Sequence, residues 1–133
     1  MELLLASAER REVEVTLDDD LHVISLQGPL ALSLLDEATD VDLEPVPYFH
    51  HVRGSVFGRA ATISRTGYSG ERGYEIFAAA TDIVALWDAL LEAGADRGVM
   101  AASFGALDKV RIEAALLFYG YDMTDEHLSL IHI

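Results

Sequence analysis

The sequence predicts an α+β domain in which an antiparallel sheet packs against helices. Short segments that alternate polar and apolar residues, with turn residues between them, are typical of half-buried strands. Two later segments place apolar residues at helical spacing instead. The chain has 133 residues and is 51% hydrophobic, which is enough to form one domain with a buried core.

Five strands are expected. Residues 12–17 (EVEVTL) alternate polar and apolar side chains, and the three aspartates that follow predict a turn into the next strand. Pro29 suits the first turn of a short helix over residues 29–38. A further turn is expected near Gly54. The predicted strands cover residues 12–17, 21–26, 48–52, 55–65 and 74–78.

Two amphipathic helices are expected to cover one side of this sheet. Thr81 or Asp82 is predicted to cap the first helix, and Gly94 to end it. Ser103 is predicted to cap the second, and Gly120 to close it. The expected apolar stripes are Ile83, Leu86, Trp87, Leu90 and Leu91 in the first helix, and Leu107, Val110, Ala114, Leu117 and Phe118 in the second.

The first residues look superficially like a signal peptide. Residues 1–8 (MELLLASA) are apolar, but Glu2 stands where such a leader carries basic residues, so we expect the end of a longer helix instead. No apolar run reaches eighteen residues, and no membrane span is predicted.

The charge and the lack of cysteine restrict the function further. A net charge of −14 argues against nucleic acid and anionic membranes as partners. The absence of cysteine excludes disulfides, thiol catalysis and thiolate-bound metals, and it fits a cytoplasmic location. Residues 51–77 alone carry net positive charge, which indicates either a bound anionic small molecule or ordinary surface arginines.

A glycine-rich segment, residues 66–73 (TGYSGERG), matches neither the dinucleotide fingerprint nor the P-loop. Its glycines allow positive φ angles and the close approach of a ligand, but this segment alone favours a plain hairpin loop. His50 and His51 are adjacent on a predicted strand and point to opposite faces, so they cannot share a metal ion. No metal site is predicted.

Glu75 is the candidate ligand-binding residue. It shares a strand face with Phe77, so its carboxylate either faces solvent or meets donors in a pocket. A heterocycle with an amino group and a ring N–H would suit it, because one carboxylate accepts both hydrogen bonds. Tyr68 could add an aromatic wall and a hydroxyl group.

Four stretches together resemble the aminomethyltransferase family, which includes the T-protein of the glycine cleavage system. Residues 65–76 contain RTGYSGE and GYEI, which resemble the family's signature. Three other stretches agree with the family in order and spacing. They are residues 26–31 (LQGPLA), residues 86–90 (LWDAL) and residues 106–123, which contain ALDKVRIEA and LFYGYDM.

The resemblance implies three domains around a central channel that binds tetrahydrofolate. Residues 1–97 would form most of the second, folate-binding domain, and residues 98–127 a helix and a return segment into the first. The family's glutamate that holds the pteridine ring matches Glu75, and the tyrosine beside it matches Tyr68. These two residues are the expected cofactor-binding pair.

Two departures from the family stand out. Leu107 occupies the position of an arginine that contacts the folate's glutamate tail in the T-protein, so that cation is lost or supplied from elsewhere. The family's catalytic aspartate lies upstream of this sequence, so the catalytic residue is unknown. Residues 128–133 (LSLIHI) match the translation of a transposon end used in preparing sequencing libraries, which predicts a non-native tail on a gene that continues.

The leading hypothesis is one-carbon transfer to tetrahydrofolate as in the glycine cleavage system. A lipoyl carrier protein would deliver methylamine, giving methylenetetrahydrofolate and ammonia, while Glu75 and Tyr68 orient the pterin. Leu107 keeps open a folate-dependent demethylase of a small methylated compound, similar to the dimethylsulfoniopropionate demethylases. A folate-binding module without catalysis is the third hypothesis. The fragment alone is expected to be inactive, because the channel needs walls that it lacks.

Overall fold

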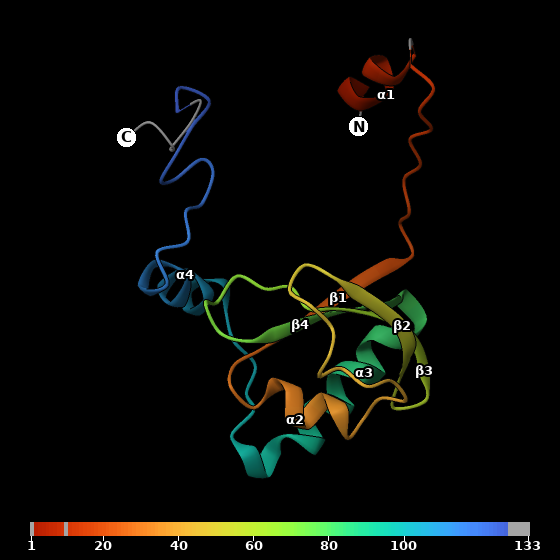
Figure 1. Ribbon diagram of the computed structural model, residues 1–133, viewed down its shortest axis with the longest axis vertical. Helices are drawn as coiled ribbons and strands as arrows, with labels where there is room; N and C mark the ends of the chain where they lie inside the picture. The colour runs from red at the N-terminus through yellow and green to blue at the C-terminus, as the bar shows by residue number, and fades with distance from the viewer. Residues whose placement is uncertain (1, 10, 128–133) are drawn as a thin grey trace.

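The computed structural model describes residues 2–9 and 11–127, and its centre is one four-stranded antiparallel sheet (Figure 1). The strands are β1 (Leu21–Gln27), β2 (His51–Val56), β3 (Arg59–Ser64) and β4 (Gly73–Ala79). They lie side by side in the order β1-β4-β3-β2, so the last strand in the chain is central. The predicted non-native tail, residues 128–133, falls outside the described residues.

Helices lie on one side of this sheet and at its end. The helices are α1 (Glu2–Ala8), α2 (Ala31–Asp36), α3 (Ala80–Ala93), the short 3-10 helix η1 (Ala95–Arg97) and α4 (Phe104–Glu113). In Figure 1, α2 and α3 cover one side of the sheet, whereas α1 and the segment after α4 rise on the other. The α+β class predicted from the sequence is confirmed. Among the helices of residues 2–9 and 11–127, none is long and apolar enough to cross a membrane.

The core lies between the sheet and helices α2 and α3. Alternation along the strands turns Ile24, Ile63 and Ile76 to the helix side, where the strand register places them next to one another. Leu86 and Leu90 of α3 pack onto this face. The remaining buried core residues are Leu26, Ala31, Leu34, Leu35, Leu43, Val46, Val56, Ala61, Tyr74 and Ala78.

The opposite face of the sheet is open and largely polar. Residues paired across neighbouring strands share a face, so the register aligns one row across all four strands. This polar row consists of Ser25, Glu75, Ser64 and His51. The next row consists of Val23, Phe77, Thr62 and Arg53. Helices α2 and α3 do not cover this face.

Two strand predictions are wrong. Residues 12–17 lie in an exposed connection without strand structure, although their alternation suits a strand. The turn between β2 and β3 falls at Phe57 and Gly58, both with positive φ, and not at Gly54. Gly54 pairs with Ala61 inside the sheet. A Cβ there would lie 2.7 Å from Asp40 Oδ1, so this glycine permits close packing and does not form a turn.

The predicted first long helix is confirmed, with an earlier start. Helix α3 begins at Ala80 after Ala79, which provides no side-chain cap, so Thr81 and Asp82 lie within the first turn. Its end at Gly94 agrees with the prediction. Trp87 lies at the edge of the apolar stripe and is 40% exposed.

The second helix begins as predicted and ends early. Ser103 caps α4 by accepting a hydrogen bond from the Ala106 amide at 3.2 Å. The helix ends at Glu113, because Ala115 adopts a left-handed conformation (φ 57°) and turns the chain before Gly120. Leu117 and Phe118 therefore do not continue the helical face.

Candidate functional site

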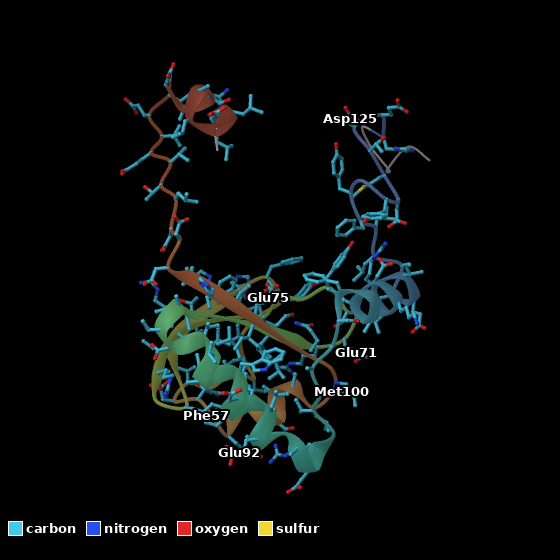
Figure 2. The ribbon with its side chains drawn as sticks, turned by 180° about the vertical axis from the view of Figure 1, so that it is seen from behind. Phe57, Glu71, Glu75, Glu92, Met100 and Asp125 are labelled. Atoms are coloured by element: carbon cyan, nitrogen blue, oxygen red, sulfur yellow. The ribbon has the colours of Figure 1, made fainter. Side chains whose placement is uncertain are left out.

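Glu75 lies near the middle of the open face of the sheet (Figure 2). It is half-buried, with Ser25 and Ser64 beside it on the neighbouring strands. The Thr66 hydroxyl donates to Glu75 Oε2, and Thr66 Oγ1 also lies 3.0 Å from Ser64 Oγ. Because a hydroxyl has one proton, Ser64 donates when Thr66 donates to the carboxylate. Glu75 shares this face of the sheet with Phe77, as predicted. The hydroxyls of Ser64 and Thr66 fix the orientation of its carboxylate.

Tyr68 lies in the loop formed by residues 65–72, which leads into β4. Its hydroxyl donates to the carbonyl of Leu117, and its ring centroid is 6.3 Å from that of Phe118. Glu75 and Tyr68 thus belong to one strand-and-loop unit but contact different neighbours. Glu75 contacts Thr66, whereas Tyr68 joins the loop to the segment after α4.

The glycines of this loop have a use that the sequence did not reveal. A Cβ on Gly67 or on Gly73 would overlap the side chain of Gln27. Gly70 has a φ of +78°, and a Cβ there would overlap the Cβ of Ala114. The glycine spacing therefore allows the loop to pack closely against Gln27 of β1 and against Ala114 at the end of α4.

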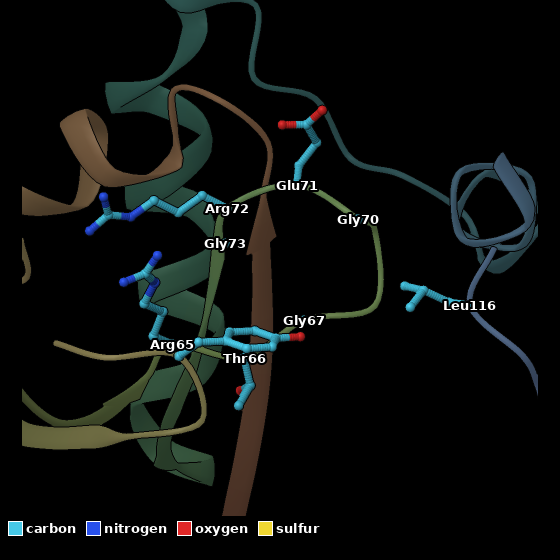
Figure 3. A pocket seen from close by; sticks show the side chains of 9 residues that line it. Arg65, Thr66, Gly67, Gly70, Glu71, Arg72, Gly73 and Leu116 are labelled. Carbon is cyan, nitrogen blue, oxygen red and sulfur yellow. The ribbon is translucent and has the colours of Figure 1, made fainter. Parts of the chain in front are cut away.

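Two of the arginines in the positive segment line a cavity of about 320 Å³ behind this loop (Figure 3). Arg65 Nη1 donates to the Val46 carbonyl at 2.9 Å. Arg72 forms an ion pair with Glu44 at 3.2 Å and a hydrogen bond to the Tyr74 hydroxyl. Both arginines fasten the loop that contains Val46 and Glu44, so the structural interpretation of these charges has direct support. A third arginine, Arg59, pairs with Asp82.

A buried arginine organises the segment after α4. Arg111 is 4% exposed, pairs with Asp108 at 2.6 Å and with Asp122, and donates to the Leu116 carbonyl at 3.0 Å. Its guanidinium also lies 5.5 Å from the Phe118 ring centroid. This network holds the segment that carries the acceptor of Tyr68.

The pKa of Asp122 is lowered because the Phe118 amide donates to its carboxylate and because Arg111 lies beside it. A carboxyl group with a depressed folded pKa stabilises the fold above its unfolded pKa, and this contribution is lost as the pH falls through the folded value. We therefore expect the segment of residues 114–122 to loosen below about pH 4. Hydrogen–deuterium exchange, corrected for intrinsic rates, would report this.

Asp122→Asn should loosen the same segment already at neutral pH and remove most of the pH dependence. Asp125→Asn, an exposed carboxylate farther along the chain, is the control and should change neither. Equal exchange in wild type and Asp122→Asn at every pH would contradict the role of this carboxylate.

Leu107 lies half-buried on α4 and lines a larger, mainly apolar cavity of about 790 Å³ between β1, α3 and residues 97–110. It supplies no charge. Within residues 2–9 and 11–127, no group of three or more histidine, aspartate or glutamate side chains could hold a metal ion.

Two residues that shape the site could not be recognised from the sequence. Thr66 was part of the recognised motif but had no assigned role, and its bond to Glu75 depends on the loop conformation. Gln27 contacts the loop across 39 positions of sequence. The sequence did contain a signal that could have drawn attention to this residue, because Gln27 is the only carboxamide side chain in the whole sequence.

Comparison with known proteins shows which family has this architecture. The family model described as the GCVT N-terminal domain matches residues 1–130. The chain is 51% identical over 121 residues to the heme-dependent oxidative N-demethylase gamma subunit of Ectopseudomonas mendocina (strain ymp), which covers 91% of this chain and 32% of that protein. It is 40% identical over 116 residues to the aminomethyltransferase of Alkaliphilus oremlandii (strain OhILAs), covering 86% and 31%.

Among solved structures, heterotetrameric sarcosine oxidase from Corynebacterium sp. U-96 has a similar fold. The TM-score is 0.59 at 22% identity, over 74% of this chain and 51% of that one. The relatives are named as enzymes or enzyme subunits, and two of them belong to multi-subunit proteins. The chain spans about a third of the length of the curated relatives. It belongs to the aminomethyltransferase family, in the region that the GCVT N-terminal domain describes.

Proposed function

We propose that this chain forms one wall of a tetrahydrofolate site in a longer protein that transfers one-carbon units. The observation that carries the proposal is the half-buried carboxylate of Glu75 on the open face of the sheet. Its Oε2 accepts from Thr66, while Oε1 accepts no hydrogen bond from the part of the chain that the structure describes. One oxygen is thus fixed by the protein and the other is free for a ligand.

The residues around Glu75 fit a pterin. A pterin ring presents an amino group and a ring N–H on one edge, and a carboxylate accepts from both. Phe77 in the next row offers an apolar surface for the ring, and the hydroxyls of Ser25 and Ser64 lie beside the carboxylate. Tyr68 is proposed as the second binding residue, in the loop of residues 65–72, where its hydroxyl donates to the Leu117 carbonyl.

In this proposal the chain binds and orients, and another part of the protein supplies the catalytic acid. The bound tetrahydrofolate supplies the nucleophilic nitrogen that accepts the one-carbon unit. Glu75 fixes the rotation of the ring in its plane, and Tyr68 restricts its position at the edge of the site. We further propose the domain division at residues 1–97 and 98–127, and a cytoplasmic location, which the cysteine-free composition fits.

The first candidate donor is methylamine on the lipoyl arm of a carrier protein, as in the glycine cleavage system. Identities of about 40% with named aminomethyltransferases support this candidate. Such a protein would act with the carrier protein as its partner.

A second candidate donor is the formaldehyde that oxidative demethylation of an N-methyl amine releases. The specific observation is the 51% identity with the gamma subunit of an N-demethylase, which exceeds the identity with the aminomethyltransferases compared above. Leu107, in place of the family's arginine, is also a departure from the T-protein. In this case the partners would be the other subunits of an oxidase-type complex.

An isotope experiment separates the candidates. A protein of the relatives' full length that contains this chain would be incubated with tetrahydrofolate and either a ¹³C-methylamine-loaded lipoyl carrier or, together with its neighbouring subunits, a ¹³C-N-methyl amine. We expect labelled methylenetetrahydrofolate from one of the two donors. Binding without transfer from either donor would indicate a non-catalytic folate module, and no binding of tetrahydrofolate would refute the proposal.

A further inference from the structure

Gln27, at the end of β1, holds the glycine-rich loop by its side chain. Its Nε2 donates to the Thr66 carbonyl at 3.2 Å and to Ser25 Oγ at 3.0 Å. Its Oε1 accepts from Ser69 Oγ at 3.0 Å. A single carboxamide therefore forms hydrogen bonds to the loop at both Thr66 and Ser69.

These two contacts lie on either side of Tyr68, one of the two residues of the proposed site. Tyr68 lies between Thr66 and Ser69, so both ends of its short span are fixed. Thr66 in turn donates to Glu75 through its hydroxyl. The carboxamide thus orders the loop around Tyr68 through main-chain and hydroxyl contacts, and it orders Glu75 through Thr66.

The glycines provide independent evidence for this arrangement. Gly67 and Gly73 both face the Gln27 side chain, and a Cβ at either position would overlap the carboxamide. The far end of a glutamine is normally free to swing away from such a clash. Here, a swing would break the hydrogen bonds to Thr66 and Ser69. The side chain and the two glycines therefore form one interlocking unit.

We infer that Gln27 is a positioning residue for ligand binding, acting through the loop of residues 65–72 on Glu75 and Tyr68. The inference rests on the proposed tetrahydrofolate site. The carboxamide suits this role because its amide nitrogen donates to Thr66 while its oxygen accepts from Ser69. Gln27 itself need not contact the ligand.

Three variants test this inference in a protein of the relatives' full length. Gln27→Ala removes the side chain, Gly67→Ala displaces it, and Gln27→Glu keeps its size and its acceptor for Ser69 while losing its donors. Ser33→Ala is the control, because within the described residues that hydroxyl bonds only to the nearby Leu30 carbonyl. Two readouts are taken at a temperature where every variant is folded: exchange of the amides of residues 66–71, and affinity for tetrahydrofolate.

Gln27→Ala and Gly67→Ala should each accelerate loop exchange severalfold and weaken tetrahydrofolate binding about tenfold. Because both disrupt one unit, the double variant should be no worse than either single one. Gln27→Glu should lie between wild type and Gln27→Ala, and Ser33→Ala should match wild type.

The two readouts distinguish failure of the inference from failure of the proposed function. Wild-type loop exchange in Gln27→Ala would overturn the holding role of Gln27. Faster exchange with unchanged affinity would overturn its role in ligand binding. Additive losses in the double variant would contradict the interlocking unit. If wild type does not bind tetrahydrofolate, the proposed function falls, and the exchange data alone decide whether Gln27 holds the loop.

Discussion

Glu75→Gln is expected to weaken tetrahydrofolate binding by about tenfold to a hundredfold, with little change in stability. A hydrogen bond to a charged group contributes roughly 1.5–3 kcal/mol, which corresponds to this loss of affinity. The amide that replaces the carboxylate keeps an acceptor for Thr66 but turns an N–H₂ group toward the donors of the ligand. Isothermal titration of the full-length protein under anaerobic conditions would measure the affinity.

Glu71→Gln is the matched control for this variant. Glu71 is an exposed glutamate of the same loop, and its carboxylate points away from the loop interior (Figure 3). The substitution makes the same chemical change four residues away and should leave the affinity within about twofold, since surface substitutions have small effects. Equal losses in the two variants, or none in Glu75→Gln, would remove Glu75 from the site.

Ile76→Ala is expected to destabilise the protein by about 2–5 kcal/mol. Ile76 is 0% exposed in the central strand, between Ile24 and Ile63 on the neighbouring strands. Truncation leaves a cavity in a closely packed core that cannot collapse around it without bending the sheet. Guanidinium unfolding followed by circular dichroism should show a clearly lower midpoint.

Val84→Ala provides the comparison for the core variant. Val84 is an aliphatic residue on the exposed side of α3 and should change the stability by less than about 0.5 kcal/mol. An Ile76→Ala midpoint equal to that of Val84→Ala would contradict the placement of the core. Together with Glu75→Gln, this pair tests whether neighbouring residues of β4 serve opposite faces, one for binding and one for stability.

Alternation predicted the strands where the two faces of the sheet meet different surroundings. In β1 and β4 the buried residues on the helix side are apolar or aromatic, such as Ile24 and Ile76. The open side is mixed, because Ser25 and Glu75 alternate with Val23 and Phe77. The same alternation at residues 12–17 led to a wrong prediction. A strand also needs a partner, and a pattern in one segment carries no information about what lies beside it.

Glycine and helix ends were harder to predict because each depends on distant contacts. Gly54 suggested a turn, but its role is to admit Asp40 and Val41 against β2. Helix α4 ends before Gly120 because Ala115 adopts a left-handed conformation, and Arg111 binds the Leu116 carbonyl and Asp122 in the segment that follows. Neither contact is visible in local sequence.

The site was partly predictable for the same reasons. The face of Glu75 followed from strand alternation, and the strand register confirms it. Its partner Thr66 lies 9 positions earlier in the chain, and Gln27 lies a further 39 positions before Thr66, so both contacts depend on how the loop closes. The binding roles of Glu75 and Tyr68 remain predictions.

The central claim is that the open face of the sheet around Glu75 binds tetrahydrofolate. Hydrogen–deuterium exchange of the full-length protein, with and without tetrahydrofolate, tests it most directly. Bound ligand should protect the amides of β4 and of residues 65–72 while leaving those of α3, on the opposite side of the sheet, unchanged. Protection confined to other regions, with none in β4 or the loop, would contradict the account.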